Sequence, residues 1–139
     1  MNPMALRLEI VTPDSKTFSD DVDQVVLPGI EGEFGVLPGH APFVTQITHG
    51  ELVVTQGSEQ HYLAVGDGFV EVKPDSVSVL TDMALMSDDI NEQEVEAALK
   101  RAEEALAQKQ LTPDESAAAM AILQKSIAQL HVKRRRRSL

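Results

Sequence analysis

The spacing of the apolar residues changes once along this 139-residue chain, near residue 88, and this change limits the folds that it can adopt. Before residue 88 apolar and polar residues alternate, as in the segment Leu6 to Ile10. Alternation with a period of two predicts a strand with one buried face. After residue 88 apolar residues recur at spacings of three and four, which predicts amphipathic helices. We therefore expect a β domain over residues 1–87 and a helical domain over residues 88–139.

The first part contains several further segments with strand character, separated by turn-forming residues such as Gly66-Asp67-Gly68. Many short strands at close spacing predict an antiparallel sandwich or barrel. The predicted strands after the first are Gln24 to Leu27, Phe43 to Thr48, Glu51 to Thr55, His61 to Val65, Gly68 to Val72 and Val77 to Thr81.

The second part is predicted to form two helices. Asp89 or Asn91 can cap the first helix, and Thr112-Pro113-Asp114-Glu115 has the residues of a capping box that starts the second. Two amphipathic helices with a short joint predict an antiparallel hairpin. Two helices alone bury little apolar area, so the hairpin should be stable only when docked, and it could hold more than one position. The expected apolar stripes are Val95, Leu99, Ala102 and Leu106, then Met120, Leu123, Ile127 and Leu130.

Charge is unevenly distributed along the chain, whose net charge is −10. The last seven residues, Lys133 to Leu139, hold five of the twelve basic residues and no acidic one. The acidic remainder argues against nucleic acid as a partner, whereas the basic tail favours an acidic target. The chain has no cysteine, and neither a signal peptide nor an apolar run of about 18 residues is apparent, so we expect a soluble or peripheral protein.

The stretch Pro28 to Pro42, PGIEGEFGVLPGHAP, is dense in glycine and proline. Glycine permits positive φ and proline fixes φ, so the stretch is expected to be too broken for an ordinary strand and too stiff for a flexible linker. It should form a shaped surface feature that presents Glu31, Glu33 and His40. A rigid loop with a few charged groups is typical of a contact surface.

No catalytic or metal-binding constellation is apparent, and the chain is not expected to be an enzyme. Two carboxyls on an exposed loop, Glu31 and Glu33, do not by themselves make an acid–base pair. Nothing in the spacing of His40, His49 and His61 requires them to converge on a metal. The acidic residues from Asp20 to Asp23 are expected to be solvated turn charges. Phosphate-binding and nucleophile-elbow motifs are absent from the sequence.

The motif GIEGEFGVLPGHAP, followed by HGELVV, resembles the G-x-E-G-E-x-G-x-x-P-G-H-A-P loop and next strand of the epsilon subunits of bacterial F-type ATP synthases. The resemblance extends over nearly the whole chain. It implies a flattened antiparallel β-sandwich followed by a two-helix hairpin. It also implies a non-catalytic rotor subunit of the central stalk, peripheral to the cytoplasmic face of the bacterial inner membrane, in a synthase driven by protons or sodium ions.

The resemblance further implies partners and contact residues. The sandwich would bind the gamma subunit on one side and the polar loops of the membrane c-ring on another. Glu33 matches the family's glutamate that faces those loops, with His40 and Glu31 in the same region. The hairpin would extend in some states toward the alpha/beta catalytic hexamer and inhibit ATP hydrolysis. The residues implied for that contact are Arg134, Arg135, Arg136 and Arg137.

One departure from the family concerns ATP. Some members bind ATP in the folded hairpin through an [IL]-D-x-x-R-A motif at the first helix. Here Asn91, Glu94 and Val95 stand at the Asp, Arg and Ala positions. An acid in place of an arginine disfavours phosphate, although Lys100 and Arg101 could still contact it. No cofactor is therefore expected. The alternative reading of the chain is a free-standing β-sandwich that binds a ligand, with the hairpin as a dimerisation arm.

Overall fold

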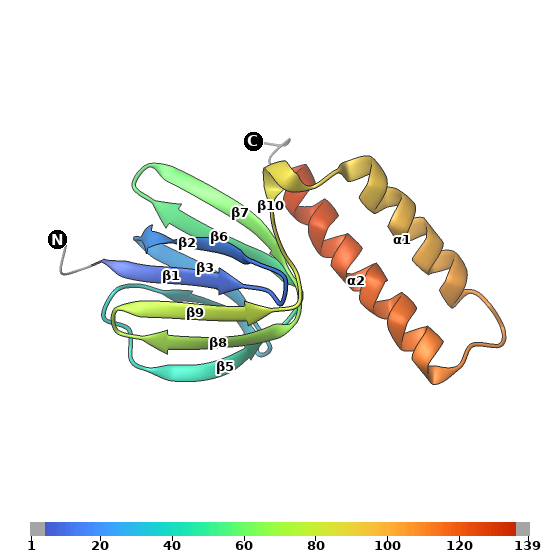
Figure 1. Ribbon diagram of the computed structural model, residues 1–139, viewed down its shortest axis with the longest axis horizontal. Coiled ribbons are helices and arrows are strands. Elements are labelled where there is room, and N and C mark those ends of the chain that lie inside the picture. The colour runs from blue at the N-terminus through green and yellow to red at the C-terminus, as the bar shows by residue number, and fades with distance from the viewer. Residues whose placement is uncertain (1–4, 136–139) are drawn as a thin grey trace.

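The computed structural model describes residues 5–135. Figure 1 shows a β-sandwich with two helices packed beyond one end of it. The elements are β1 (Leu6–Val11), β2 (Lys16–Val22), β3 (Gln24–Gly29), β4 (Gly32–Val36), β5 (Phe43–Ile47), β6 (Gly50–Gln56), β7 (Glu59–Val65), β8 (Gly68–Lys73), β9 (Ser76–Thr81), β10 (Ala84–Met86), the single turn η1 (Ser87–Asp89), α1 (Glu92–Leu106) and α2 (Pro113–Arg135).

The strands form two layers, one in the order β2-β1-β9-β8-β5 and the other in the order β4-β3-β6-β7-β10. The layers are joined at one corner, where Gly29 of β3 pairs with Ile47 of β5. Neighbouring strands are antiparallel except for β1 and β9, which are parallel. The predicted sandwich followed by two helices is therefore confirmed.

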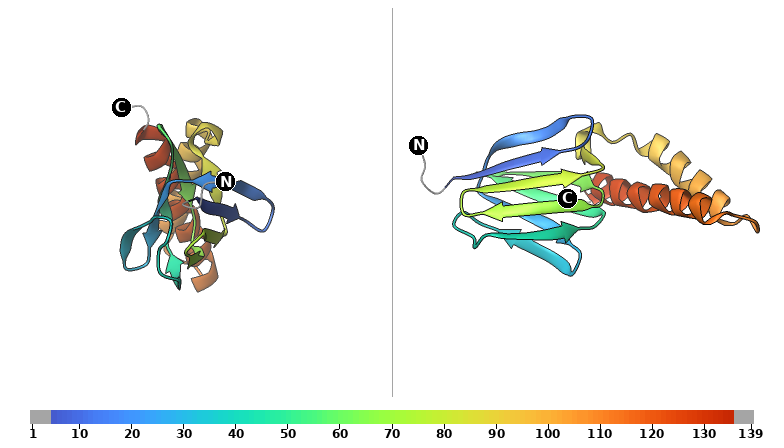
Figure 2. Two further views of the ribbon diagram at one scale, coloured as in Figure 1. Left: turned by 90° about the vertical axis from the view of Figure 1, so that its left-hand side faces the viewer. Right: turned by 60° about the horizontal axis from the view of Figure 1, so that its bottom comes forward.

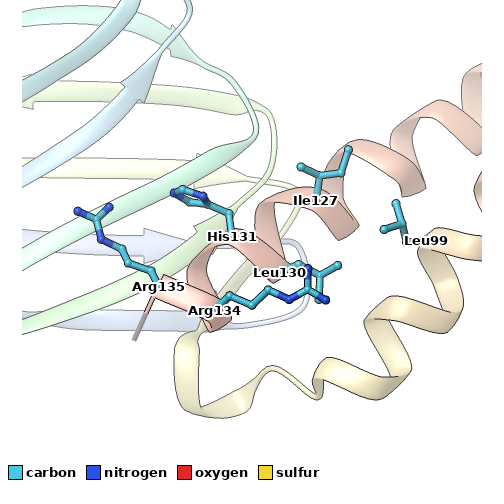
Figure 3. Close-up of a pocket in the computed structure, with 6 residues that line it drawn as sticks. All are labelled: Leu99, Ile127, Leu130, His131, Arg134 and Arg135. Carbon is cyan, nitrogen blue, oxygen red and sulfur yellow. The ribbon is translucent and has the colours of Figure 1, made fainter. Parts of the chain in front are cut away.

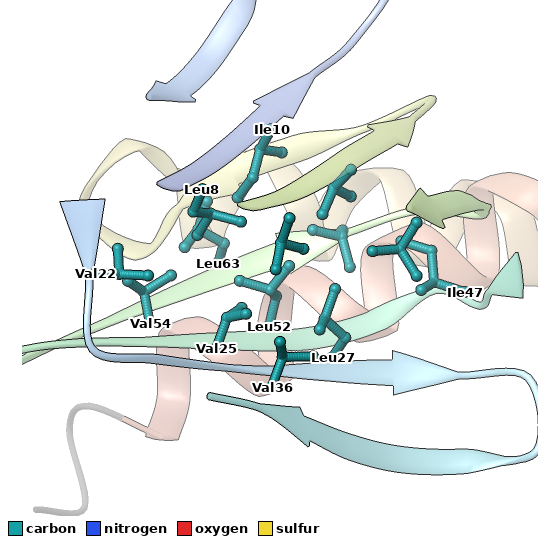
Figure 4. Close-up of a cluster of buried hydrophobic side chains, with 14 of the residues drawn as sticks. Leu8, Ile10, Val22, Val25, Leu27, Val36, Ile47, Leu52, Val54 and Leu63 are labelled. Atoms are coloured by element: carbon teal, nitrogen blue, oxygen red, sulfur yellow. The ribbon is translucent and has the colours of Figure 1, made fainter. Parts of the chain in front are cut away.

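The core lies between the two layers and consists of aliphatic side chains (Figure 4). Leu8 and Ile10 come from one layer, and Leu27, Leu52 and Leu63 come from the other; all five are fully buried. Each of these side chains contributes about 1.5–3 kcal/mol through burial. The alternation seen in the sequence thus places one side of every central strand in this core.

The stretch from Pro28 to Pro42 differs from expectation, because Gly32–Val36 forms strand β4 and pairs with β3. Ile30 and Glu31 connect the two strands in a tight hairpin, and Gly32 has a φ of 132°, which disfavours other residues. The prediction that this stretch is too broken for a strand was wrong in its first half. The glycines make the turn, and buried Val36 anchors the strand to the core.

A second difference concerns the acidic residues after Phe18. Asp20 and Asp21 lie in β2, paired with β1, and not in a turn. Both side chains are exposed, and the guanidinium of Arg7 lies 3.7 Å from the carboxylate of Asp21. The spacing of apolar residues did not reveal this strand. As an edge strand, β2 is mostly exposed, so apolar and polar residues do not alternate clearly along it.

The helix starts follow the predicted capping chemistry. The side chain of Asn91 accepts a hydrogen bond of 3.1 Å from the backbone N–H of Glu94. At α2 the hydroxyl of Thr112 accepts a bond of 3.1 Å from Glu115 N–H, and the Glu115 carboxylate accepts one of 3.3 Å from Thr112 N–H. This reciprocal pair is a capping box.

The buried face of α2 is not the predicted one. Met120 and Ile127 are 41% and 52% exposed, whereas Leu130 is buried as expected. The other buried positions of α2 are mostly small, namely Ala119, Ser126, Ala128 and Val132. Because α2 packs against α1 and also against β6 and β7, its buried positions are not confined to the single apolar stripe expected for a helix with one neighbour.

The hairpin docks on the sandwich through α2, which lies against β6 and β7 (Figure 2). Leu130 and Val132 of α2 and Val95 of α1 form one buried cluster with Ala64 of β7 and Ile90 of the linker. This cluster is separate from the core of the sandwich. Within residues 5–135, no helix has the length and apolarity required to cross a membrane.

Candidate functional site

The predicted contact residues Glu31, Glu33 and His40 line one open groove of about 350 Å³. Glu31 lies in the β3–β4 turn, Glu33 in β4, and His40 in the loop between β4 and β5. The structure therefore brings together the three residues that the sequence singled out. Phe34 and Phe43 also line the groove, so it combines carboxylates with an aromatic wall.

The geometry fixes His40 but leaves the carboxylates open to solvent. The Nδ1 atom of His40 lies 2.8 Å from the carbonyl oxygen of Ala41, and its ring lies 5.2 Å from the ring of Phe43. Glu31 and Glu33 are exposed. The groove therefore presents carboxylates to solvent and is suited to contact with cationic or polar groups.

A second surface is apolar and lies on the outer side of β5, β8 and β9. Val44, Phe69 and Leu80 are 66%, 53% and 59% exposed. Phe69 pairs with Leu80 across β8 and β9, and Val44 lies diagonally beside Phe69 across β5 and β8. We call these three residues the outer apolar face. The right-hand view of Figure 2 shows β8 and β9 in front, with the helices beyond the strand ends.

Sequence reasoning missed the outer apolar face, although the signal was present. Phe43-Val44, Phe69-Val70 and Val79-Leu80 each place two apolar residues in succession within an alternating strand. One member of each pair belongs inside the sandwich, so the other must point outward. A doubled apolar position in an otherwise alternating strand therefore indicates an apolar residue on the outer face of the sheet.

The third surface is the basic end of α2, where successive cations contact different parts of the chain. Lys133 donates a hydrogen bond of 3.1 Å to the backbone carbonyl of Ser87 in η1. The Nε atom of Arg134 lies 3.7 Å from Glu92 of α1, and its guanidinium also binds Glu96. Arg135 binds the carboxylate of Glu51 in β6. The predicted Arg136 and Arg137 lie outside the described residues.

Glu51 occupies an unusual environment for a carboxylate. Its side chain is 10% exposed, and its Oε2 atom has no hydrogen-bond partner within residues 5–135. Burial raises the pKa of Glu51, whereas the nearby charges of Arg135 and His131 act in the opposite direction. The Arg135 guanidinium also lies 5.2 Å from the centre of the Tyr62 ring, a cation–π distance. No local pattern predicts this cluster, because Glu51 looks like an ordinary outward residue of a strand.

A pocket of about 580 Å³ lies beside the basic end of α2 (Figure 3). Leu99, Ile127 and Leu130 give it an apolar lining, and His131 adds an imidazole. In Figure 3 Arg135 points toward the sheet.

The residues at the positions of the [IL]-D-x-x-R-A motif have structural roles here, since Asn91 caps α1 and Val95 is buried in the hairpin cluster.

Comparison with known families gives two adjacent matches that together span most of the chain. Residues 5–87 match the model of the ATP synthase delta/epsilon chain β-sandwich domain. Residues 88–134 match the model of the long α-helix domain of the same chain. The two matches meet at the point where the apolar period of the sequence changes.

Individual relatives agree with these matches. The ATP synthase epsilon chain of Dehalococcoides mccartyi is 42% identical over 132 residues, covering 95% of this chain and 94% of the relative. That of Geotalea uraniireducens is 44% identical over 110 residues, covering 79% and 78%. A chain in the structure of the Euglena gracilis mitochondrial ATP synthase has a TM-score of 0.78 at 23% identity, covering 93% of this chain and 81% of that one, which shows a shared fold.

Proposed function

This chain belongs to the delta/epsilon family of ATP synthase subunits, and we propose that it is a rotor subunit that couples the catalytic head to the membrane ring. A chain of this family is a subunit of the complex and not its catalytic subunit. In the proposed arrangement the sandwich binds the gamma subunit and the c-ring, and the hairpin restrains ATP hydrolysis. The protein would then lie peripherally on the cytoplasmic face of the bacterial membrane.

The outer apolar face is the observation that carries this proposal. Three large apolar side chains, each more than half exposed and close together on one sheet, form an apolar surface of the kind that marks a protein contact. A permanent partner that covers it accounts for the exposure. We assign this face to gamma, because obligate contacts are more apolar than the polar contact expected with c-ring loops.

Mixing the purified chain with gamma is expected to give a stable one-to-one complex, because burial of the outer apolar face favours association. Size-exclusion chromatography with light scattering measures the stoichiometry. The chain alone should elute as a monomer. A dimer of the chain that does not bind gamma would instead support the free-standing ligand-binding module.

The carboxylate groove is proposed as the c-ring contact, with Glu33 as its principal residue. The support is its open position beside Glu31 and His40 and its match to the family motif. Electrostatic complementarity of this kind favours a partner whose loops offer cationic or polar groups.

Changing Glu33 to lysine is expected to weaken attachment of the catalytic head to the membrane several-fold, because charge reversal replaces attraction by repulsion. The measurement is the ATPase activity retained on washed membranes, together with ATP-driven ion pumping. Glu59→Lys is the matched control, since Glu59 is an exposed carboxylate at the start of β7 that lies outside the groove. Equal retention by both variants would contradict the assignment of Glu33.

The basic end of α2 is the part proposed to act on the alpha/beta hexamer. Its support is the concentration of cations at one helix end in an otherwise acidic chain. Arginine engages carboxylates in a bidentate manner, which suits acidic segments of a partner. In the folded position described here, Arg134 and Arg135 are already bound to carboxylates of the chain itself.

A further inference from the structure

The contact of Arg135 with Glu51 joins the far end of the chain to the middle of the sandwich. Arg134 binds Glu96 within the hairpin, so it does not hold α2 to the strands. Arg135 instead reaches from the last turn of α2 to β6, where it binds Glu51 and lies over Tyr62 of β7. Of these two neighbouring arginines, Arg135 is the one that ties the hairpin to the sandwich.

The charged and titratable groups around Glu51 come from every element packed against it. His131 and Arg135 face it from α2, Glu33 acts on it from β4, and Tyr62 lies under the arginine from β7. Glu33 carries the same sign as Glu51 and so adds to the cost of its charge. Burial is the larger effect, since 10% of the Glu51 side chain is exposed. Glu51 therefore tolerates burial as an anion only while a cation lies beside it.

Removing one member of such a buried ion pair has a different effect on stability from removing both members. Removing the cation leaves a buried and uncompensated carboxylate, which strongly destabilises the buried arrangement. Replacing both members with neutral groups removes the desolvation cost together with the attraction and is often close to neutral. The stability of the docked hairpin should therefore depend on Arg135 far more when Glu51 is present than when it is absent.

We propose that Glu51 makes docking of the hairpin conditional on Arg135, so that a partner which takes this arginine also releases α2 from the sandwich. An acidic segment that binds Arg135 then deprives Glu51 of its directly bound cation and leaves only the weaker influence of His131 from α2. The docked position becomes unfavourable at the moment when the arginine engages its new target. Binding of Arg135 by an acidic partner thus opposes docking of the hairpin, although the buried cluster and the 3.1 Å ion pair of Lys125 with Asp82 still favour it.

The identity of that partner as the catalytic head rests on the proposed function, but the coupling between Arg135 and Glu51 does not. The coupling can be measured on the isolated full-length chain. We call this dependence of docking on Arg135 and Glu51 the latch. If the measurement on the isolated chain fails, the latch is wrong, but the proposed role in the ATP synthase is unaffected. Failure of the chain to bind gamma would instead overturn the proposed role and leave the latch standing.

The test measures the docked fraction with spin labels. The chain contains no cysteine, so Ser58→Cys in the β6–β7 turn and Ala121→Cys in α2 introduce two unique labelling positions, both exposed. Double electron–electron resonance then reports the distance between sandwich and hairpin. The labelled chain should show one narrow distance, and Arg135→Gln should lower the ratio of docked to released chain by about tenfold.

Two further variants make the test decisive. Adding Glu51→Gln to Arg135→Gln should restore docking to within about twofold of the labelled parent, because no buried charge remains. Arg134→Gln is the matched control. It removes a neighbouring arginine whose ion pairs with Glu92 and Glu96 both lie within the hairpin, so it should leave docking unchanged. Circular dichroism confirms that each variant is folded.

Three results would overturn the latch. These are a docked fraction that Arg135→Gln does not change, a double variant no better docked than the single one, and a released hairpin in the labelled parent.

The pH dependence gives an independent check. Because burial raises the pKa of Glu51, its contribution to docking is fully present below the ordinary pKa of a glutamate and is lost as pH rises through the raised pKa. Acid should therefore restore docking of Arg135→Gln but have less effect on the double variant.

Discussion

Replacing Phe69 with aspartate is expected to weaken binding of this chain to gamma by about 100-fold, or about 2.7 kcal/mol. Phe69 lies at the centre of the outer apolar face, between Val44 and Leu80. The variant loses the transfer of an aromatic side chain out of water and brings a carboxylate into an apolar contact. Titration calorimetry or surface-based binding with purified gamma measures the change.

The fold of the Phe69→Asp variant should be intact, because the Phe69 side chain is 53% exposed and lies outside the sandwich core. Its thermal midpoint should stay close to that of the parent. Ile122→Asp is the matched control, since Ile122 is 48% exposed but lies on α2. If both variants bind gamma as tightly as the parent, the outer apolar face is not the gamma contact.

Removing residues 89–139 is expected to raise ATP hydrolysis by the reconstituted catalytic head several-fold. The reason is that the truncated chain lacks both the hairpin and the cations proposed to engage the head. The measurement compares steady-state ATPase rates of heads assembled with the full-length or truncated chain at equal occupancy. Equal rates would mean that the hairpin of this member does not inhibit.

The truncated chain should still fold, because every residue of the sandwich core cluster lies between Leu6 and Ala84. Deletion uncovers Ala64 and Tyr62, which belong to the separate cluster under the hairpin. A shorter deletion of residues 133–139 separates the two possible origins of inhibition. If the basic tail is responsible, this deletion should raise the rate nearly as far as loss of the whole hairpin.

Local patterns predicted much of the fold correctly. Alternation gave most of the central strands, and the capping residues Asn91, Thr112 and Glu115 gave the helix starts. These features depend on neighbours a few residues apart, so they can be read directly along the chain. Strand β4 was missed because glycine was taken as a breaker, whereas Gly32 serves the turn and Val36 is anchored by the core.

Local patterns also found Glu31, Glu33 and His40, which the fold brings to one groove. They did not find the outer apolar face as a surface, because Val44, Phe69 and Leu80 become neighbours only through the pairing of three strands. They predicted the wrong face for α2, since exposed Met120 and Ile127 look like core residues in the sequence.

Short-range periodicity and turn chemistry specify the two-part architecture, the helix caps and the residues of the carboxylate groove, so these features can be predicted from neighbouring residues. Which faces are buried and which charges meet depends on contacts between distant segments, and these exist only in the folded chain. Glu51 and Arg135 lie 84 residues apart, and no local pattern relates them. The two residues meet because α2 docks on β6 and β7. Burial then makes the charged form of Glu51 unfavourable unless Arg135 lies beside it.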